Sequence, residues 1–144
     1  MTPRVRITRL HHSAVLPVYQ TSGAAGFDLA ASETTTVAPG QVTLVPTGLV
    51  IEVPEGHFLG IFARSSTPLK RGLMVANGVG IVDSDYSGPT DEIKIEVYNF
   101  TNAEVTVMPG DRLAQGVLMP FVRAEWNERG TAGGPSRGGF GTTG

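Results

Sequence analysis

Residues 77–86 gather side chains that could recognise a flat ring and act on a bond beside it. The segment reads Asn-Gly-Val-Gly-Ile-Val-Asp-Ser-Asp-Tyr. Gly78 and Gly80 permit close approaches that a Cβ would prevent, and Asn77-Gly78 is a strong tight-turn signal between extended residues. Such a hairpin can offer amides and carbonyls to a heterocycle, with the Asn77 side chain completing the pattern and Asp83 one short step away. An ordinary turn with solvated acids is the alternative that this segment alone leaves open.

The composition describes one globular domain of modest charge. The chain has 144 residues, of which 40% are hydrophobic and 17% charged, enough for a single buried core. Its net charge of −2 at pH 7 provides no basic surface for a nucleic-acid polymer. It has no cysteine, which excludes disulfides, thiol chemistry and cysteine-bound metal. Because no signal peptide or membrane-length apolar run is present, we expect a soluble, cytoplasmic protein.

Short extended segments separated by turns predict an all-β fold. The 19 glycines and 10 prolines are spread along the chain and leave little room for long helices. One short helix is expected to open near Ser66-Thr67-Pro68, with a capping hydroxyl, and to close by Gly72. These features predict an antiparallel barrel or a jelly-roll-like sandwich. Apolar patterns predict its strands within residues 5–10, 41–55, 57–63, 92–100, 105–107 and 113–122.

Residues 129–144 differ in kind from residues 1–128, so we place a boundary between a β-barrel domain and a flexible arm there. The arm carries seven glycines and almost no apolar surface to bury, and alone it should be mobile. One interpretation is a frayed terminus. The other is a lid in which glycine amides around Gly141 wrap a phosphate, Arg137 supplies charge and Phe140 covers a base.

Five separated segments resemble the five motifs of the trimeric dUTPases, the dUTP diphosphatases. Each is a weak signal alone, but together they follow the family's order to the C-terminus. The resemblance implies a distorted jelly-roll-like β-barrel in a homotrimer whose active sites are shared between subunits. The five segments are Ala25-Gly26-Phe27-Asp28-Leu29, Ala63-Arg64-Ser65-Ser66, residues 77–86, Gly110-Asp111-Arg112-Leu113-Ala114-Gln115 and residues 137–144.

The implied reaction is hydrolysis of dUTP to dUMP and pyrophosphate, which limits uracil in DNA and supplies dUMP for thymidylate synthesis. By resemblance, Asp83 orients and deprotonates the water that attacks the α-phosphorus. A turn-capping side chain is the alternative for Asp83. The resemblance assigns the nucleoside to Asn77, Gly80, Ile81, Val82, Tyr86 and Lys94, with Tyr86 beneath the deoxyribose excluding a 2′-hydroxyl. The alternative for Tyr86 is a half-buried strand tyrosine.

The remaining motifs are expected to hold the triphosphate. By resemblance the contacts come from Arg64, Ser65, Ser66 and Gln115, and from Arg137, Phe140 and Gly141 of the arm; amides at the helix start also favour phosphate. Mg²⁺ is the expected cofactor, and it prefers substrate oxygens and water to a protein cage. Asp28 would reach it indirectly, through water. Asp28 and Asp111 organise the phosphate loops in this interpretation, and a structural ion pair remains the alternative for each.

The sequence departs from the family at three places. Pro135 stands where the fifth motif usually has an arginine, so that Arg137 becomes the expected substitute. Residues 87–92 form a longer link than usual after Tyr86, with no assigned role. Thr67-Pro68-Leu69 replaces the more usual small and apolar residues.

Two other functions stay open. The related dCTP deaminases share the fold, the Ser65-Ser66 pair and a glutamate matched by Glu96. However, Leu69 replaces their arginine, and they lack the fifth motif. The deaminase alternative is that this activity replaces dUTP hydrolysis or accompanies it as a second activity. The third possibility is a catalytically silent nucleotide-binding regulatory trimer, against which Asp83 and the arm argue.

Overall fold

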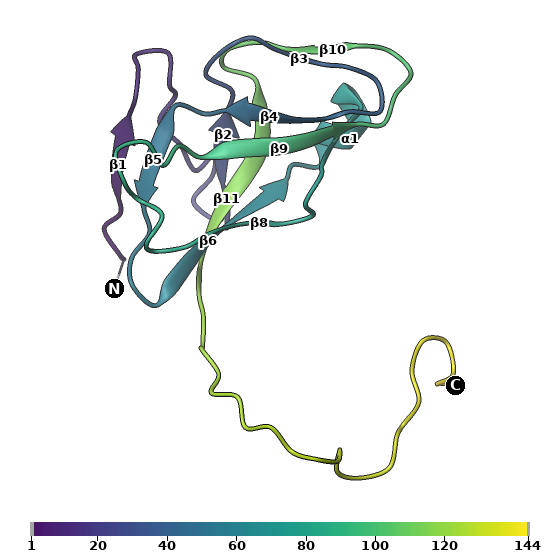
Figure 1. Ribbon diagram of the computed structural model, residues 1–144. Helices are drawn as coiled ribbons and strands as arrows, with labels where there is room; N and C mark the ends of the chain where they lie inside the picture. The colour runs from purple at the N-terminus through teal and green to yellow at the C-terminus, as the bar shows by residue number, and fades with distance from the viewer. Residues whose placement is uncertain (1, 144) are drawn as a thin grey trace.

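The computed structural model describes residues 2–143, and in this range it contains eleven short strands and one helix (Figure 1). The elements in chain order are β1 (Arg6–Arg9), β2 (Phe27–Ala30), β3 (Thr35–Val37), β4 (Val42–Pro46), β5 (Leu49–Glu52), β6 (His57–Ala63), α1 (Ser66–Arg71), β7 (Leu73–Val75), β8 (Gly80–Val82), β9 (Lys94–Asn99), β10 (Val105–Val107) and β11 (Arg112–Pro120). This confirms the predicted β-rich architecture with one short helix.

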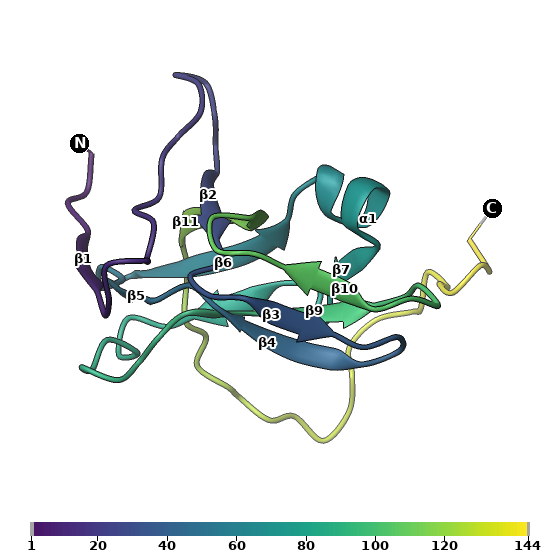
Figure 2. The ribbon, with the colours of Figure 1, turned by 90° about the horizontal axis from the view of Figure 1, so that it is seen from above.

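The strands form small antiparallel sheets joined by crossovers. The largest has the order β2-β11-β6-β8, and a second has the order β4-β9-β7. The pairs β1-β5 and β10-β3 complete the set. Figure 2 shows α1 directly after the end of β6, outside the strands. Non-sequential neighbours of this kind are what the predicted jelly-roll-like fold requires.

The core lies between the inner faces of the sheets. On β9, Ile95 and Val97 are buried whereas Lys94 and Tyr98 face outward, as the alternating pattern predicts. Aliphatic side chains from both larger sheets surround them, and burial of this apolar surface stabilises the fold. The fully buried large members of the core are Leu29, Val37, Val45, Leu49, Leu59, Leu73, Ile93, Ile95, Val97, Val107 and Leu113.

One predicted extended segment is divided between two sheets. The run from residue 41 to residue 55 breaks at Gly48, which has a φ of 68°. The buried Thr47 hydroxyl donates to Ile93 O at 2.6 Å. Because the chain turns here, β4 pairs with β9 and β5 pairs with β1.

The predicted hairpin at residues 77–86 is wrong, although its turn is present. Gly78 has a φ of 73°, and its N–H donates to Val75 O at 3.1 Å. The flanking strands do not pair with each other, since β7 pairs with β9 and β8 pairs with β6. The segment thus connects the two larger sheets, and its second half becomes the β8 edge.

The helix begins and ends where the sequence predicted, at Ser66 and before Gly72, but its cap differs. Gly72 ends it with a φ of 67°. The predicted capping hydroxyl is wrong, because Ser65 makes no side-chain cap hydrogen bond. The buried Thr67 hydroxyl instead donates to Leu113 O at 2.7 Å. A hydroxyl at this helix therefore fastens α1 to β11.

The last strand ends at Pro120, and residues 121–143 contain no helix or strand. Figure 1 shows this segment leaving β11 and running away from the strands. Thr142 Oγ1 bonds to Gly139 N at 2.8 Å and to Gly139 O at 2.6 Å, a contact local to the arm. The boundary at residue 128 stays a prediction, and Gly144 of the fifth motif lies outside the described residues. The helix found in residues 2–143 is far too short to cross a membrane.

Candidate active site

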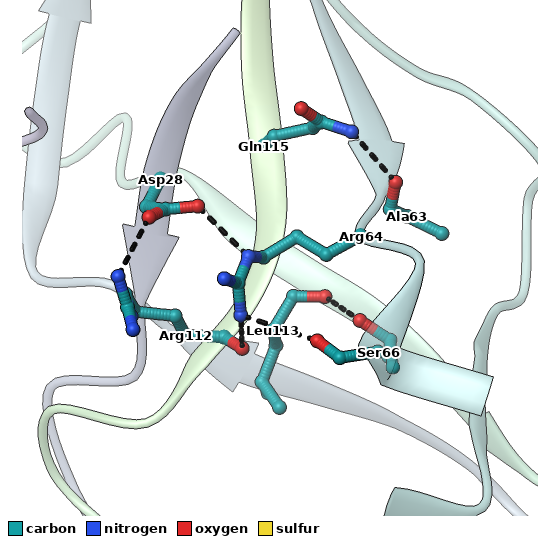
Figure 3. Close-up of polar contacts among 8 residues, drawn as sticks. Asp28, Ala63, Arg64, Ser66, Arg112, Leu113 and Gln115 are labelled. Carbon is teal, nitrogen blue, oxygen red and sulfur yellow. Dashed lines mark hydrogen bonds and ion pairs between the residues drawn. The ribbon is translucent and has the colours of Figure 1, made fainter. Parts of the chain in front are cut away.

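A carboxylate between two guanidinium groups forms the centre of one polar cluster (Figure 3). Asp28 Oδ1 lies 2.8 Å from Arg64 Nε, and Asp28 Oδ2 lies 3.0 Å from Arg112 Nη1. The Asp28 side chain is only 13% exposed. Two positive charges face one negative charge, so the cluster keeps a net positive charge. It suits an anionic ligand such as a phosphate, which arginine can contact through paired N–H groups.

Strand pairing brings the first, second and fourth motifs together at this cluster. Gln115 on β11 stands opposite Asp28 on β2 and opposite Phe62 on β6. Its Nε2 donates to Ala63 O at 3.1 Å, which fixes the amide beside Arg64 (Figure 3). A Cβ at Gly26 would lie 2.7 Å from Gln115 Oε1, so a side chain there would displace the Gln115 amide.

Arg64 also connects the start of α1 to β11. Its Nη1 donates to Arg112 O at 3.1 Å and lies 3.4 Å from Ser66 Oγ. With the Thr67 bond to Leu113, these contacts place Ser65 and Ser66 at the edge of the cluster. The predicted phosphate ligands Arg64, Ser66 and Gln115 therefore belong to one constellation.

Asp111 lies beside this cluster and pairs with a residue that the sequence did not single out. Its Oδ2 accepts from Arg71 Nη1 at 2.9 Å and from Met108 N at 2.8 Å. Burial raises the pKa of Asp111. The hydrogen bond and charge of Arg71, together with the Met108 N–H, lower this pKa further than burial raises it, and the net direction is downward. The one sequence signal for Arg71 was its position as a basic residue in the last turn of α1, and this signal does not name Asp111 as its partner.

An open cavity of about 410 Å³ lies at the other edge of the four-stranded sheet. The predicted nucleoside residues Asn77, Gly80, Ile81, Val82, Tyr86 and Lys94 all line it. A Cβ at Gly80 would lie 3.5 Å from Asn77 Nδ2, which shows how closely the amide approaches the strand. The lining residues that sequence reasoning missed are Leu44, Ile61, Thr90, Glu92 and Ile93. Thr90 and Glu92 come from the long link after Tyr86.

Asp83 follows β8 and is exposed to solvent. Its main-chain carbonyl accepts from Tyr86 N at 3.2 Å. Within residues 2–143, no hydrogen bond or ion pair is made by the Asp83 carboxylate. The alternative of a turn-capping side chain therefore finds no contact here, and the carboxylate is accessible to water.

The two groups of residues lie at opposite edges of the same sheet. The order β2-β11-β6-β8 separates Asp28 from Ile81 by three strand spacings, roughly 14 Å at about 4.8 Å each. The arm, which carries Arg137, Phe140 and Gly141, runs away from the strands (Figure 1). Phe140 is fully exposed. A single subunit thus presents the predicted residues in three separate parts.

Comparison with known proteins identifies the family. The sequence profile of the family described as dUTPase matches residues 12–144. The chain belongs to the dUTPase family. The deoxyuridine 5'-triphosphate nucleotidohydrolase of Lactococcus lactis is 39% identical over 142 residues, covering 96% of this chain and 94% of the relative.

Solved dUTPases have the same fold. The crystal structure of dUTPase from Streptococcus mutans superposes with a TM-score of 0.77 at 36% identity, covering 83% of this chain and 98% of that one. The dUTPase of phage phi11, whose structure details the coordination of a structural Mg(II) ion, has a TM-score of 0.79 at 21% identity. It covers 90% of this chain and 98% of the phage chain.

The family match also bears on the deaminase alternative. Leu69, which replaces the deaminase arginine, lies on α1 and is 85% exposed. Glu96 lies opposite Leu44 on the β4-β9-β7 sheet and is not a lining residue of the cavity. These positions and the dUTPase match do not favour deamination.

Proposed function

We propose that this dUTPase hydrolyses dUTP to dUMP and pyrophosphate, thereby limiting uracil in DNA and supplying dUMP for thymidylate synthesis. The observation that carries this proposal is the pairing of a net positive cluster at Asp28 with a cavity lined by Asn77 and Tyr86, in a member of this family. The Lactococcus lactis relative is named for the same reaction.

The cavity supplies the groups that recognise the nucleoside. Asn77 and the main chain of residues 80–82 offer donors and acceptors to the uracil edge, with Lys94 on the neighbouring wall. In this proposal a thymine methyl group would not fit, and cytosine would leave donors and acceptors unpaired, which a site built to hydrogen-bond its substrate rejects strongly. The ring of Tyr86 lies beneath the deoxyribose in this proposal and leaves no room for a 2′-hydroxyl.

Asp83 acts as the general base. It takes a proton from a water molecule whose oxygen attacks the α-phosphorus, and the bond from this phosphorus to the bridging oxygen breaks as pyrophosphate leaves. The accessible carboxylate that follows the cavity-lining β8 supports this role.

The phosphates lie against the positive cluster. The body of the protein contacts them through Arg64, Ser65, Ser66 and Gln115. The arm adds contacts from Arg137, Phe140 and Gly141. Asp28 orients Arg64 and Arg112 through the ion pairs at 2.8 and 3.0 Å. Such preorganised charges stabilise the negative charge that develops as the leaving group departs.

Mg²⁺ is the proposed cofactor, and the residues present fit an ion held mainly by substrate. The described part of the chain has no group of three or more His, Cys, Asp or Glu residues arranged to hold a metal. Both oxygens of Asp28 already contact guanidinium groups, so this carboxylate would reach the ion only through water. When bound, Mg²⁺ would neutralise charge on the triphosphate.

A homotrimer with shared active sites completes the proposal, which places the enzyme in the cytoplasm with the nucleotide pool. Two features support a partner subunit. Val122 and Trp126, at the base of the arm, are 96% and 94% exposed, and an open apolar cavity of about 340 Å³ lies beside β1. Subunits that cover these surfaces could bring a cluster, a cavity and an arm to one nucleotide. The solution mass should then be three times 15.1 kDa.

A substrate panel tests the function. The purified protein is incubated with Mg²⁺ and each of dUTP, dCTP, dTTP, dATP and dGTP, and the products are separated. We expect dUMP and pyrophosphate from dUTP alone. Uracil nucleotides formed from dCTP would support the deaminase instead, and binding of dUTP without products would support the silent regulatory trimer.

A further inference from the structure

The long link between β8 and β9 forms a wall of the nucleoside cavity, and its contacts assign it a role. Thr90 and Glu92 line the cavity together with Asn77 and Tyr86. Within the link, Gly88 N donates to Asp91 Oδ2 at 2.7 Å, and Asp91 N donates to Gly88 O at 3.1 Å. The link is therefore an ordered turn that sits next to the proposed sugar pocket.

Glu92 accepts two hydrogen bonds from residues outside the segment 87–92. Its Oε1 accepts the Gly48 N–H at 2.7 Å, and its main-chain oxygen accepts the Tyr86 hydroxyl at 3.0 Å. The first bond reaches the turn between β4 and β5, and the second reaches the ring that faces the cavity.

The turn that receives Glu92 is rigid. Gly48 has a φ of 68°, and a Cβ there would lie 2.8 Å from Ala14 Cβ. The neighbouring Thr47 is fully buried, and its hydroxyl donates to Ile93 O at 2.6 Å. A side chain bonded to this turn has little freedom to move, whereas Tyr86 is 41% exposed.

We propose that Glu92 is a positioning residue for sugar selection. Its carboxylate fixes residue 92 to the Gly48 turn, and the fixed carbonyl of residue 92 holds the Tyr86 hydroxyl, so that the ring stays where a 2′-hydroxyl would collide with it. This inference rests on the proposed function, because it takes the cavity as the deoxyribose site. The role of the longer link is then to place Glu92 between the Gly48 turn and Tyr86.

The test compares dUTP with UTP, which differs only by the 2′-hydroxyl. The variants are Glu92→Ala, Glu92→Gln and Tyr86→Phe, with the double variant Tyr86→Phe/Glu92→Ala and the exposed Glu104→Ala as a control for lost charge. The ratio of kcat/KM for dUTP to that for UTP is measured for each. Glu92→Ala and Tyr86→Phe should each lower the ratio about tenfold, the effect of one hydrogen bond.

The double variant should lower the ratio no further than either single variant, because both remove the same restraint. Glu92→Gln should keep the ratio, since its amide oxygen can still accept the Gly48 N–H, and Glu104→Ala should also keep it. An unchanged ratio in Glu92→Ala, with both substrates slowed equally, would reduce Glu92 to a structural residue and overturn the proposal. Equal losses in Glu92→Gln and Glu92→Ala would also overturn it.

A ligand-free readout separates this proposal from the function on which it rests. The chain has only three tyrosines, so ¹³C-labelled tyrosine gives few ring signals, and Tyr86→Phe assigns one of them. Glu92→Ala should shift the Tyr86 signal and Glu92→Gln should not. If wild-type protein hydrolyses no dUTP, the proposed function fails, while an unshifted Tyr86 signal in Glu92→Ala refutes the positioning role by itself.

Discussion

At the scale of single residues, Asp83 differs from Asp28 and Asp111 because, within residues 2–143, its carboxylate contacts no basic group. Asp28 and Asp111 each meet arginine, so their charges organise neighbouring groups. A carboxylate open to water is the one that can take a proton from it.

Replacing Asp83 with asparagine should therefore remove the base and keep the shape. Turnover of dUTP should fall by about 10² to 10⁴, while binding of a non-hydrolysable analogue changes little. Steady-state kinetics and calorimetric titration measure the two quantities. Asp85→Asn, two residues further along the same exposed segment, is the matched control. Near-normal turnover in Asp83→Asn would refute the role of this carboxylate.

Ionisation of Asp111 makes the stability of the folded protein depend on pH. In the folded protein the hydrogen bond and charge of Arg71 and the Met108 N–H outweigh burial and hold the pKa of Asp111 below its ordinary value, so the folded state favours the charged form. The resulting stabilisation is present above the unfolded pKa and is lost as the pH falls through the folded pKa. Asp111→Asn should be less stable than wild type at pH 7, by no more than about 1 kcal/mol for a partly exposed pair. The difference should shrink below pH 4 in urea unfolding curves. A difference that grows toward low pH would contradict the ion pair with Arg71.

At the scale of elements, α1 is short and depends on its contacts with β11. Thr67 and Leu113 are both fully buried, and the hydroxyl of the first donates to the carbonyl of the second. Thr67→Val keeps the shape but leaves that carbonyl unpaired, and should cost about 1 to 3 kcal/mol in the free energy of unfolding. Thr67→Ser, which keeps the hydroxyl, should lose less. Equal losses in both variants would show that the methyl group, and not the hydrogen bond, matters.

The arm is the second element with a defined expectation. The last strand ends at Pro120, so ending the chain after Glu128 should leave the melting temperature of the body almost unchanged. Turnover should fall by orders of magnitude because a lid that excludes water is lost. Arg137→Ala should reproduce much of that loss. If truncation matters and Arg137→Ala does not, Arg129 becomes the better phosphate ligand. If truncation has no effect on turnover, the arm is only a frayed terminus.

The strands that the sequence predicted well are those with one buried face. Ile93, Ile95 and Val97 alternate on and before β9, and the expected inward face is the observed one. The short strands β3 and β7, with three residues each, lie outside the ranges that the sequence predicted. The hairpin at Asn77-Gly78 was predicted from local turn chemistry, which fixes the turn but not the partners of the strands beside it. The partners are set by tertiary pairing of β8 with β6.

The site residues that belong to sequence motifs could be predicted. The residues that reach the site only through contacts distant in sequence could not. Asn77 and Tyr86 line the cavity as expected. Glu92 and Arg71 act through contacts with Gly48 and Asp111, which are about forty positions away in sequence. Spacing along the chain contains no signal for such pairs.

At the scale of the whole molecule, the proposed chemistry needs groups that one subunit keeps apart. The positive cluster and the proposed nucleoside cavity occupy opposite edges of one sheet, and the segment after β11 runs away from the strands (Figure 1). The exposed Val122 and Trp126 give the segment after β11 a surface that a partner could cover. A shared site in a homotrimer accounts for both observations.

The central claim is that water attacks the α-phosphorus of dUTP, and isotope labelling tests it most directly. The enzyme is incubated with dUTP and Mg²⁺ in H₂¹⁸O, and the products are examined by mass spectrometry. The account predicts one ¹⁸O atom in dUMP and none in pyrophosphate. Label in pyrophosphate, or release of inorganic phosphate with dUDP, would place the attack at another phosphorus and contradict the account.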